Sequence, residues 1–77
     1  MVIKILGIGC PNCRKLERNA KEAANILGLD AEFVKVTDLD EISAYGILRT
    51  PGLVVDEKVV SFGRIPTPAE IVKLISG

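Results

Sequence analysis

Histidine is absent from this chain of 77 residues. Without it the sequence holds no Ser-His or Cys-His pair, so we expect no hydrolysis by a catalytic triad of that kind. The same absence bears on metals, because a closed structural zinc site needs four ligands. The two cysteines supply only half of such a set. We therefore expect no structural zinc site within one chain.

Net charge and long apolar runs are lacking as well. Ten basic residues balance ten acidic ones, so the formal net charge is zero. A nucleic-acid-binding domain needs a basic face, and we expect no nucleic-acid partner. No apolar run reaches the roughly 18 residues of a membrane span, and the start MVIKILGIGC resembles no export signal. The sequence thus predicts a soluble, cytoplasmic protein with no membrane partner.

Hydrophobic residues, in contrast, make up 48% of the chain. That share is too high for a disordered protein and predicts one compact domain over residues 1–77. A domain of about 60 residues buries only about 60% of the surface that its unfolded chain exposes, and this one is slightly larger. We expect a thin hydrophobic core.

The first half of the chain shows a strand, a helix and a second strand. Val2 to Leu6 is a short apolar run that ends at glycine, which predicts a buried strand. Pro11 to Leu27 has apolar residues at helical spacing and Gly28 as its stop, with Glu17 and Lys21 paired on the outer face. Ala31 to Val36 predicts the second strand. Two strands joined through a helix are expected to pair in parallel.

The second half predicts a short helix, a hairpin and a closing helix. Asp38 resembles an N-cap with Glu41 as its capping partner, and this helix ends near Gly46. The other predicted elements are hairpin strands Leu53 to Val55 and Lys58 to Phe62 around Asp56-Glu57, then a helix from Thr67 to Ser76 that begins with the capping box Thr67-Pro68-Ala69-Glu70. The order is strand, helix, strand, helix, strand, strand, helix, which is a small α/β layer fold.

Both cysteines lie in GIGCPNC, between the first strand and the first helix. Pro11 favours the first helical turn, so we expect Cys10 at the N-cap or just before it, where backbone N–H groups and the helix dipole stabilise a thiolate. Cys13 shares the buried stripe with Leu16 and Ala20 and should be less exposed. Cys10 is the candidate nucleophile in disulfide exchange, and Cys13 the candidate resolving thiol.

Other roles for these thiols remain open at this point. A structural disulfide is not favoured, because closing a four-residue loop stabilises a fold by only about 2 kcal/mol. Two thiolates could hold a cuprous ion, or two chains could share an ion or a cluster. An interaction module with incidental cysteines is less favoured, because Cys10 is expected at a helix start.

These features together resemble the thioredoxin and glutaredoxin superfamily over nearly the whole chain. The resemblance is closest to small thioredoxin-like redox proteins of archaea and bacteria. It is carried by the start GIGCPNC, by Thr50 before Pro51-Gly52-Leu53, and by the late Gly63-Arg64.

The resemblance implies a thioredoxin-like fold with a central four-stranded mixed sheet, in the order 2-1-3-4, flanked by helices. It further implies a dithiol-disulfide oxidoreductase with Cys10 and Cys13 as its redox-active pair, and a cis peptide before Pro51 beside them. The backbone of Thr50 would pair with an extended substrate. Expected partners are protein or small-thiol disulfides and a reductase or other thiol donor, with no cofactor and no metal, and the protein would be a monomer.

The sequence also departs from the patterns of related families. Gly9 stands where thioredoxins usually have tryptophan, and Asn12 where glutaredoxins have tyrosine. Gly63-Arg64 replaces the glycine pair with which glutaredoxins bind glutathione. The alternative function is a cuprous-ion-binding or chaperone domain of the heavy-metal-associated type, which also has Cys-x-x-Cys after its first strand. That type usually has methionine at the position of Ile8 and ends on a strand, so the predicted C-terminal helix favours the redox protein.

Overall fold

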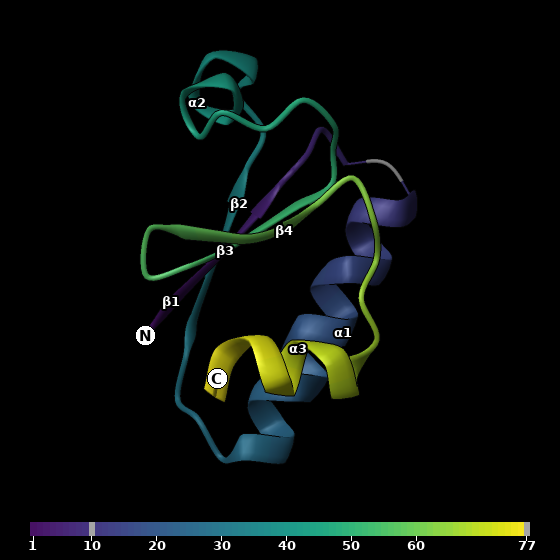
Figure 1. Ribbon diagram of the computed structural model, residues 1–77, viewed down its shortest axis with the longest axis vertical. Helices are drawn as coiled ribbons and strands as arrows, with labels where there is room; N and C mark the ends of the chain where they lie inside the picture. Colours follow the sequence, from purple (N-terminus) through teal and green to yellow (C-terminus); the bar gives the residue numbers. More distant parts are fainter. Residues whose placement is uncertain (10, 77) are drawn as a thin grey trace.

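A computed structural model describes residues 1–9 and 11–76 (Figure 1). Its elements are β1 (Val2–Leu6), α1 (Pro11–Leu27), β2 (Glu32–Val36), α2 (Leu39–Ala44), β3 (Gly52–Val55), β4 (Lys58–Phe62) and α3 (Pro68–Ser76). This is the predicted order, and each boundary lies within a few residues of its prediction. No helix of the described residues is long and apolar enough to cross a bilayer.

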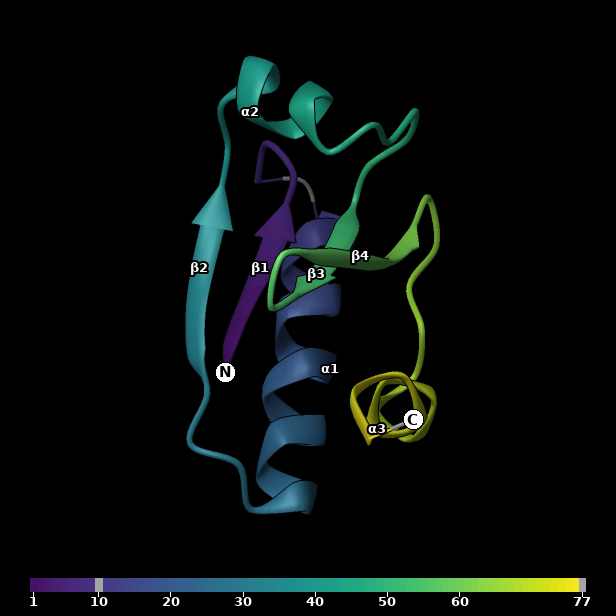
Figure 2. The same ribbon diagram turned by 60° about the vertical axis from the view of Figure 1, so that its left-hand side comes forward.

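The strands form one mixed sheet in the order β2-β1-β3-β4. β1 pairs in parallel with β2, as the connection through α1 predicts, and antiparallel with β3. β3 and β4 form the predicted antiparallel hairpin. Figures 1 and 2 show α1 and α3 together on one face of this sheet, with α2 at the end where β1 and β2 finish. The α/β fold and the strand order expected from the resemblance are confirmed.

Side chains alternate across the sheet and divide the core into two clusters. The cluster under α1 and α3 contains Ile3, Ile5, Leu16, Ala20, Ala23, Leu53, Val55 and Ile71. The cluster on the opposite face contains Leu6, Val36, Ile42, Ile47 and Val54. Small alanine side chains let α1 lie close to the sheet. This packing fixes the first turn of α1 beside the end of β1.

Local sequence signals account for the hairpin and for the start of α3. Asp56 and Glu57 both have positive φ, 48° and 69°, as both central residues of a type I′ turn must. At α3 the Thr67 N–H donates to Glu70 Oε1 at 3.1 Å, and the Glu70 N–H donates to Thr67 Oγ1 at 3.2 Å. The predicted capping box is confirmed.

One local expectation was wrong. The Asp38 side chain caps α2 by accepting the Asp40 N–H at 2.8 Å, but within the described part of the chain Glu41 makes no reciprocal bond to it. On α3, Ile71 is fully buried and Leu74 is exposed.

Candidate active site

Four connections of the chain meet at the end of the sheet where β1 finishes. The last residue of β1, Leu6, pairs with Gly52 at the start of β3. The next residue, Gly7, donates its N–H to the carbonyl of Val36 at 2.9 Å, which holds the turn after β1 against the end of β2. In Figure 1 this turn, the start of α1, the loop before β3 and the loop after β4 lie together at the upper right.

Cys13 lies in the first turn of α1 and is 5% exposed. Its place on the buried stripe with Leu16 and Ala20 was predicted correctly. The sulfur lies against the backbone of Gly7, in the space that a Cβ atom at residue 7 would require. Glycine at this position therefore makes room for the thiol directly beneath the turn. Cys10 lies outside the described residues, so its exposure and its role stay predictions.

A small hollow of about 250 Å³ reaches Cys13 from the side of β2. Ile5, Gly7, Gly9, Cys13, Arg14, Glu17, Lys35 and Thr37 line it. The sulfur thus lies beside a polar opening although the residue itself is buried.

Glu17 forms the charged wall of that hollow. Its side chain is only 15% exposed, and its two carboxylate oxygens pair with Lys21 Nζ and Lys35 Nζ, each at 3.2 Å. Burial raises the pKa of this carboxyl group, but the hydrogen bonds from both lysines outweigh burial and the net pKa is lowered. The predicted Glu17–Lys21 pair is present, with Lys21 exposed, and Glu17 also pairs with Lys35.

The Thr50–Pro51 peptide is cis, as the resemblance implied. Pro51 is buried and Thr50 is exposed. The Pro51 carbonyl accepts the N–H of Gly63 at 3.0 Å, which joins the loop before β3 to the loop after β4. A Cβ atom at Gly52 would lie 2.8 Å from Ile47 Cδ1, so a larger residue after the proline would require the Ile47 side chain to shift.

The sheet register places Thr50–Pro51 and Cys13 at the same end of the molecule. Gly52, which follows the proline, pairs with Leu6, and Cys13 lies against Gly7, the residue after Leu6. The two sequence motifs that predicted a site are thus brought together by two neighbouring strands. The substrate-binding role of Thr50 and Pro51 stays a prediction.

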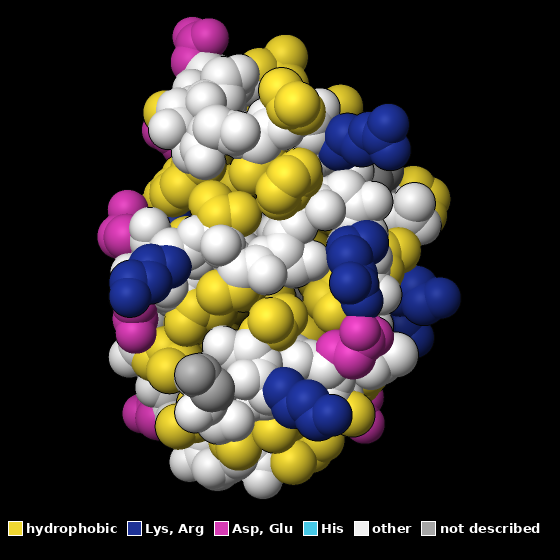
Figure 3. Space-filling model, in the orientation of Figure 1, with side chains coloured by type: hydrophobic (Ala, Val, Ile, Leu, Met, Phe, Trp, Pro, Cys, Tyr) yellow, Lys and Arg dark blue, Asp and Glu magenta, His cyan; other side chains and the backbone are white. Residues whose placement is uncertain are grey.

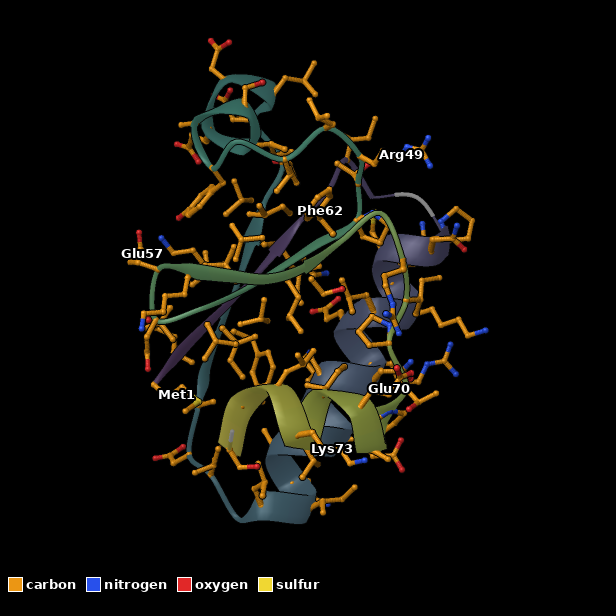
Figure 4. All side chains as sticks on the ribbon, viewed as in Figure 1. Met1, Arg49, Glu57, Phe62, Glu70 and Lys73 are labelled. Atoms are coloured by element: carbon orange, nitrogen blue, oxygen red, sulfur yellow. The ribbon has the colours of Figure 1, made fainter. Side chains whose placement is uncertain are left out.

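Exposed apolar and basic side chains surround this end, and the sequence analysis did not identify them. Leu48 is 92% exposed and Phe62 is 48% exposed, while Ile8 is exposed in the turn before Cys10. Arg49 extends from the loop before β3, beside Phe62 in the view of Figure 4. Apolar residues in loops follow no periodicity, so no local pattern marked them.

A larger hollow of about 530 Å³ lies between β4 and α3, away from both sequence motifs. Val60, Phe62 and Leu74 are among its apolar lining residues. At its edge Arg64 Nη2 contacts Glu70 Oε2 at 2.6 Å, and Glu70 is also the capping residue of α3. The backbone hydrogen bond from Thr67 and the nearby Arg64 lower the pKa of Glu70 despite some desolvation. None of the predicted site residues lies here.

Metal binding was the other chemistry considered for the cysteines. Within residues 1–9 and 11–76, no three side chains of His, Cys, Asp or Glu lie close enough together to hold a metal ion. Cys10, which the cuprous-ion alternative also requires, lies outside these ranges. The last described element is α3, a helix, and heavy-metal-associated domains end on a strand.

The family described as "Thioredoxin domain" matches residues 1–76 of this sequence. The chain belongs to the thioredoxin family. A protein named thioredoxin from Methanothermobacter thermautotrophicus is 46% identical over 76 residues, which cover 99% of each chain. Another protein named thioredoxin, from Methanocaldococcus jannaschii, is 46% identical over 71 residues, which cover 92% of this chain and 81% of the relative.

A solved structure of another protein has a similar fold. A solved structure described as that of a malarial protein superposes with a TM-score of 0.65, over 97% of this chain and 92% of that one. The two sequences are 14% identical, so this likeness shows a shared fold alone. The resemblance drawn from GIGCPNC, Thr50-Pro51 and Gly63-Arg64 is confirmed at the level of the thioredoxin family.

Proposed function

We propose that this thioredoxin-family protein carries out dithiol-disulfide exchange through Cys10 and Cys13. The observation that carries the proposal is the position of Cys13, buried against Gly7 after β1 and at the same end of the sheet as the cis Thr50–Pro51 peptide. A sheltered second thiol is what the resolving role requires, because it must not react with other disulfides. Cys10, three residues earlier, is the thiol that meets the substrate.

The exchange proceeds in two balanced steps. The Cys10 thiolate attacks one sulfur of the substrate disulfide, so that a mixed disulfide forms and one substrate thiolate leaves. Cys13 then loses its proton and attacks the Cys10 sulfur, which forms the Cys10–Cys13 disulfide and releases the second substrate thiolate. Two electrons pass from the protein to the substrate. The hollow beside Cys13 gives its proton a path to solvent.

Thr50 and Pro51 orient the substrate in this proposal. The exposed Thr50 offers its backbone to an extended segment of the substrate, while the bond from Gly63 to the Pro51 carbonyl keeps the loop in place. A reductase or another thiol donor then returns the pair to the dithiol form. The chemistry needs no cofactor, and we infer a monomer with one domain over residues 1–77, working in the reducing cytoplasm.

A trapping experiment tests the assignment of roles. Cys13→Ser should accumulate mixed disulfides through Cys10 that persist until an external thiol is added, because the resolving thiol is missing. Cys10→Ser should neither exchange nor trap. Trapping through Cys13, or copper bound stoichiometrically in the presence of a strong chelator, would contradict the proposal.

The direction of electron flow follows from a redox titration of the pair. A potential near thioredoxin's value of about −270 mV would make the protein a reductant of its substrates. A potential near about −120 mV would make it an oxidant.

A further inference from the structure

Basic residues outnumber acidic ones near the proposed active site. Residues 7–16, 46–55 and 59–67 span three of the connections that meet there, and they contain four basic residues and no acidic one, although the whole chain has a net charge of zero. The nearby carboxylates are Glu17, at the hollow beside Cys13, and Glu70, which pairs with Arg64. On the face drawn in Figure 3, most of the dark blue Lys and Arg side chains lie on the right and one lies at the left edge, while the acidic ones lie mainly on the left and at the top. On this face the charges are therefore unevenly distributed.

Arg49 is the basic residue best placed to meet a substrate. It directly precedes Thr50 and the cis peptide, and it is exposed. Its stem lies over Gly63, where an added Cβ atom would come within 3.2 Å of Arg49 Cβ. Gly63 in turn donates its N–H to the Pro51 carbonyl. The loop that would hold the substrate thus also fixes the base of the Arg49 side chain.

Arg49 has no carboxylate partner among residues 1–9 and 11–76. Arg64, in contrast, contacts Glu70 at 2.6 Å. Figure 4 shows the end of the Arg49 side chain directed away from the ribbon. A guanidinium group that is fixed at its base and unpaired at its tip can bind a carboxylate of another molecule in bidentate fashion.

Apolar surface adjoins this cation. Leu48, the residue before Arg49, is 92% exposed, and Phe62, the residue before Gly63, is 48% exposed. The core of the domain does not cover the exposed part of either side chain. An exposed apolar patch bordered by charge is typical of a protein interaction site.

We propose that the preferred substrates of this protein are disulfides flanked by acidic side chains, and that Arg49 selects them. This inference rests on the proposed exchange through Cys10 and Cys13. A carboxylate next to the substrate disulfide pairs with Arg49, while apolar residues beside it contact Leu48 and Phe62. Opposite charges speed encounter and fix orientation, so the preference appears as a faster reduction rate that salt weakens.

Three synthetic peptides of one sequence test this, each closed by one disulfide that is flanked by glutamate, by glutamine or by lysine. The reduced protein should reduce the glutamate peptide about tenfold faster than the glutamine peptide at low ionic strength, and the lysine peptide should be slowest. Near 1 M salt, where the Debye length falls to about 3 Å, the three rates should converge.

Variants of Arg49 separate recognition from general charge. Arg49→Glu should reverse the order, so that the lysine peptide becomes the faster substrate, and Arg49→Lys should retain part of the preference. Lys58→Glu is the matched control, because it changes the net charge equally at the far end of β4. It should leave the ratio of the three rates unchanged.

The outcomes distinguish this inference from the proposed function. A neutral small disulfide, hydroxyethyl disulfide, reports the chemistry of the pair without flanking charges. The inference is wrong, and the proposed function stands, if hydroxyethyl disulfide is reduced but the three peptides are reduced at equal rates. The same conclusion follows if Lys58→Glu alters the ratio of the peptide reduction rates as much as Arg49→Glu does. If neither hydroxyethyl disulfide nor any of the peptides is reduced, both the inference and the proposed function are wrong.

Discussion

The sulfur of Cys13 takes the place of the side chain that Gly7 lacks. Gly7 is buried directly after β1, and Cys13 is buried in the first turn of α1. The contact couples the end of the central strand to the start of the helix at the one point where a thiol must be held. A side chain at residue 7 and a sulfur in this position exclude each other.

Replacing Gly7 with alanine should therefore damage the site. The added methyl group overlaps the Cys13 sulfur, so the helix start or the thiol must shift, and overpacking of this kind costs about 1–3 kcal/mol. We expect a drop in the free energy of unfolding, measured with denaturant, and a fall on the order of tenfold in the disulfide exchange rate.

Gly28→Ala serves as the control for that experiment. Gly28 has φ 67° and open space around it at the end of α1. Alanine there should cost about 1 kcal/mol through backbone strain and leave the exchange rate unchanged. If Gly7→Ala and Gly28→Ala changed the free energy of unfolding and the exchange rate by the same amounts, the contact between Gly7 and Cys13 would not contribute to function.

Alkylation should discriminate between the two cysteines. Cys13 is 5% exposed, while Cys10 is predicted at the positive end of the helix dipole. At neutral pH the Cys13→Ser variant, which retains Cys10, should react with iodoacetamide about tenfold faster than the Cys10→Ser variant. Mass spectrometry over time measures both rates. Equal rates would remove the basis for naming Cys10 the nucleophile.

Stability should fall in acid, partly through Glu17. The folded state lowers the pKa of this carboxyl group below its ordinary value of 4.5, so the folded state favours the ionised form. Its contribution to stability is complete above that value and disappears as the pH falls through the lower folded pKa. Glu17→Gln should therefore narrow the difference between unfolding free energies measured at neutral pH and at about pH 3.5.

A control for the acid experiment lies on the same helix. Glu22 is exposed and, within the described residues, forms no ion pair. Glu22→Gln should keep the pH dependence of the original protein. If the Glu17 and Glu22 variants showed the same pH dependence, the pairing of Glu17 with Lys21 and Lys35 would not contribute to acid stability.

Thr67→Ala should lower the free energy of unfolding and leave the disulfide exchange rate unchanged. It removes the hydroxyl group that accepts the Glu70 N–H at 3.2 Å, and loss of an N-cap costs about 1 kcal/mol. Denaturant unfolding should show this loss, while the exchange rate per folded molecule stays constant. A stability unchanged within error would mean that water replaces the cap at no cost.

Glutathione should serve poorly as the sole electron donor. Gly63-Arg64 stands where glutaredoxins have the glycine pair that binds glutathione. Here the Gly63 N–H donates to the Pro51 carbonyl, and the stem of the Arg49 side chain lies over Gly63. An assay with a glutathionylated peptide, compared with a glutaredoxin under the same conditions, measures this. Turnover equal to that of the glutaredoxin would refute the expectation.

Local signals in the sequence were sufficient for most of the fold. The spacing of Leu16 and Ala20, the Thr67 to Glu70 capping box and the polar pair Asp56-Glu57 each act over a few residues, and each feature appears where predicted. Glu41 was the exception: Asp38 accepts the Asp40 N–H, but within the described residues the Glu41 carboxylate does not accept the Asp38 N–H in return. Whether such a reciprocal bond forms depends on side-chain geometry as well as on sequence spacing.

The site was predictable only in part, for a different reason. Cys13 and Thr50-Pro51 belong to recognisable motifs, and the cis peptide could be expected only through the resemblance. Lys35 reaches Glu17 from another strand, and Arg49 lies over Gly63 from another loop. Contacts between distant segments produce no repeating pattern in the sequence, so they cannot be predicted until the sheet register is known.

The position of β1 between β2 and β3 has a consequence for how the domain opens. Its backbone groups are hydrogen-bonded to neighbours on both sides, and Ile3 and Leu6 are fully buried. Amide protons of such a strand exchange with solvent only when the whole domain unfolds, whereas those of edge strands exchange through smaller openings. The turn after β1 therefore starts from one of the two inner strands, where we expect slow amide exchange, and local opening at either edge of the sheet should leave it anchored.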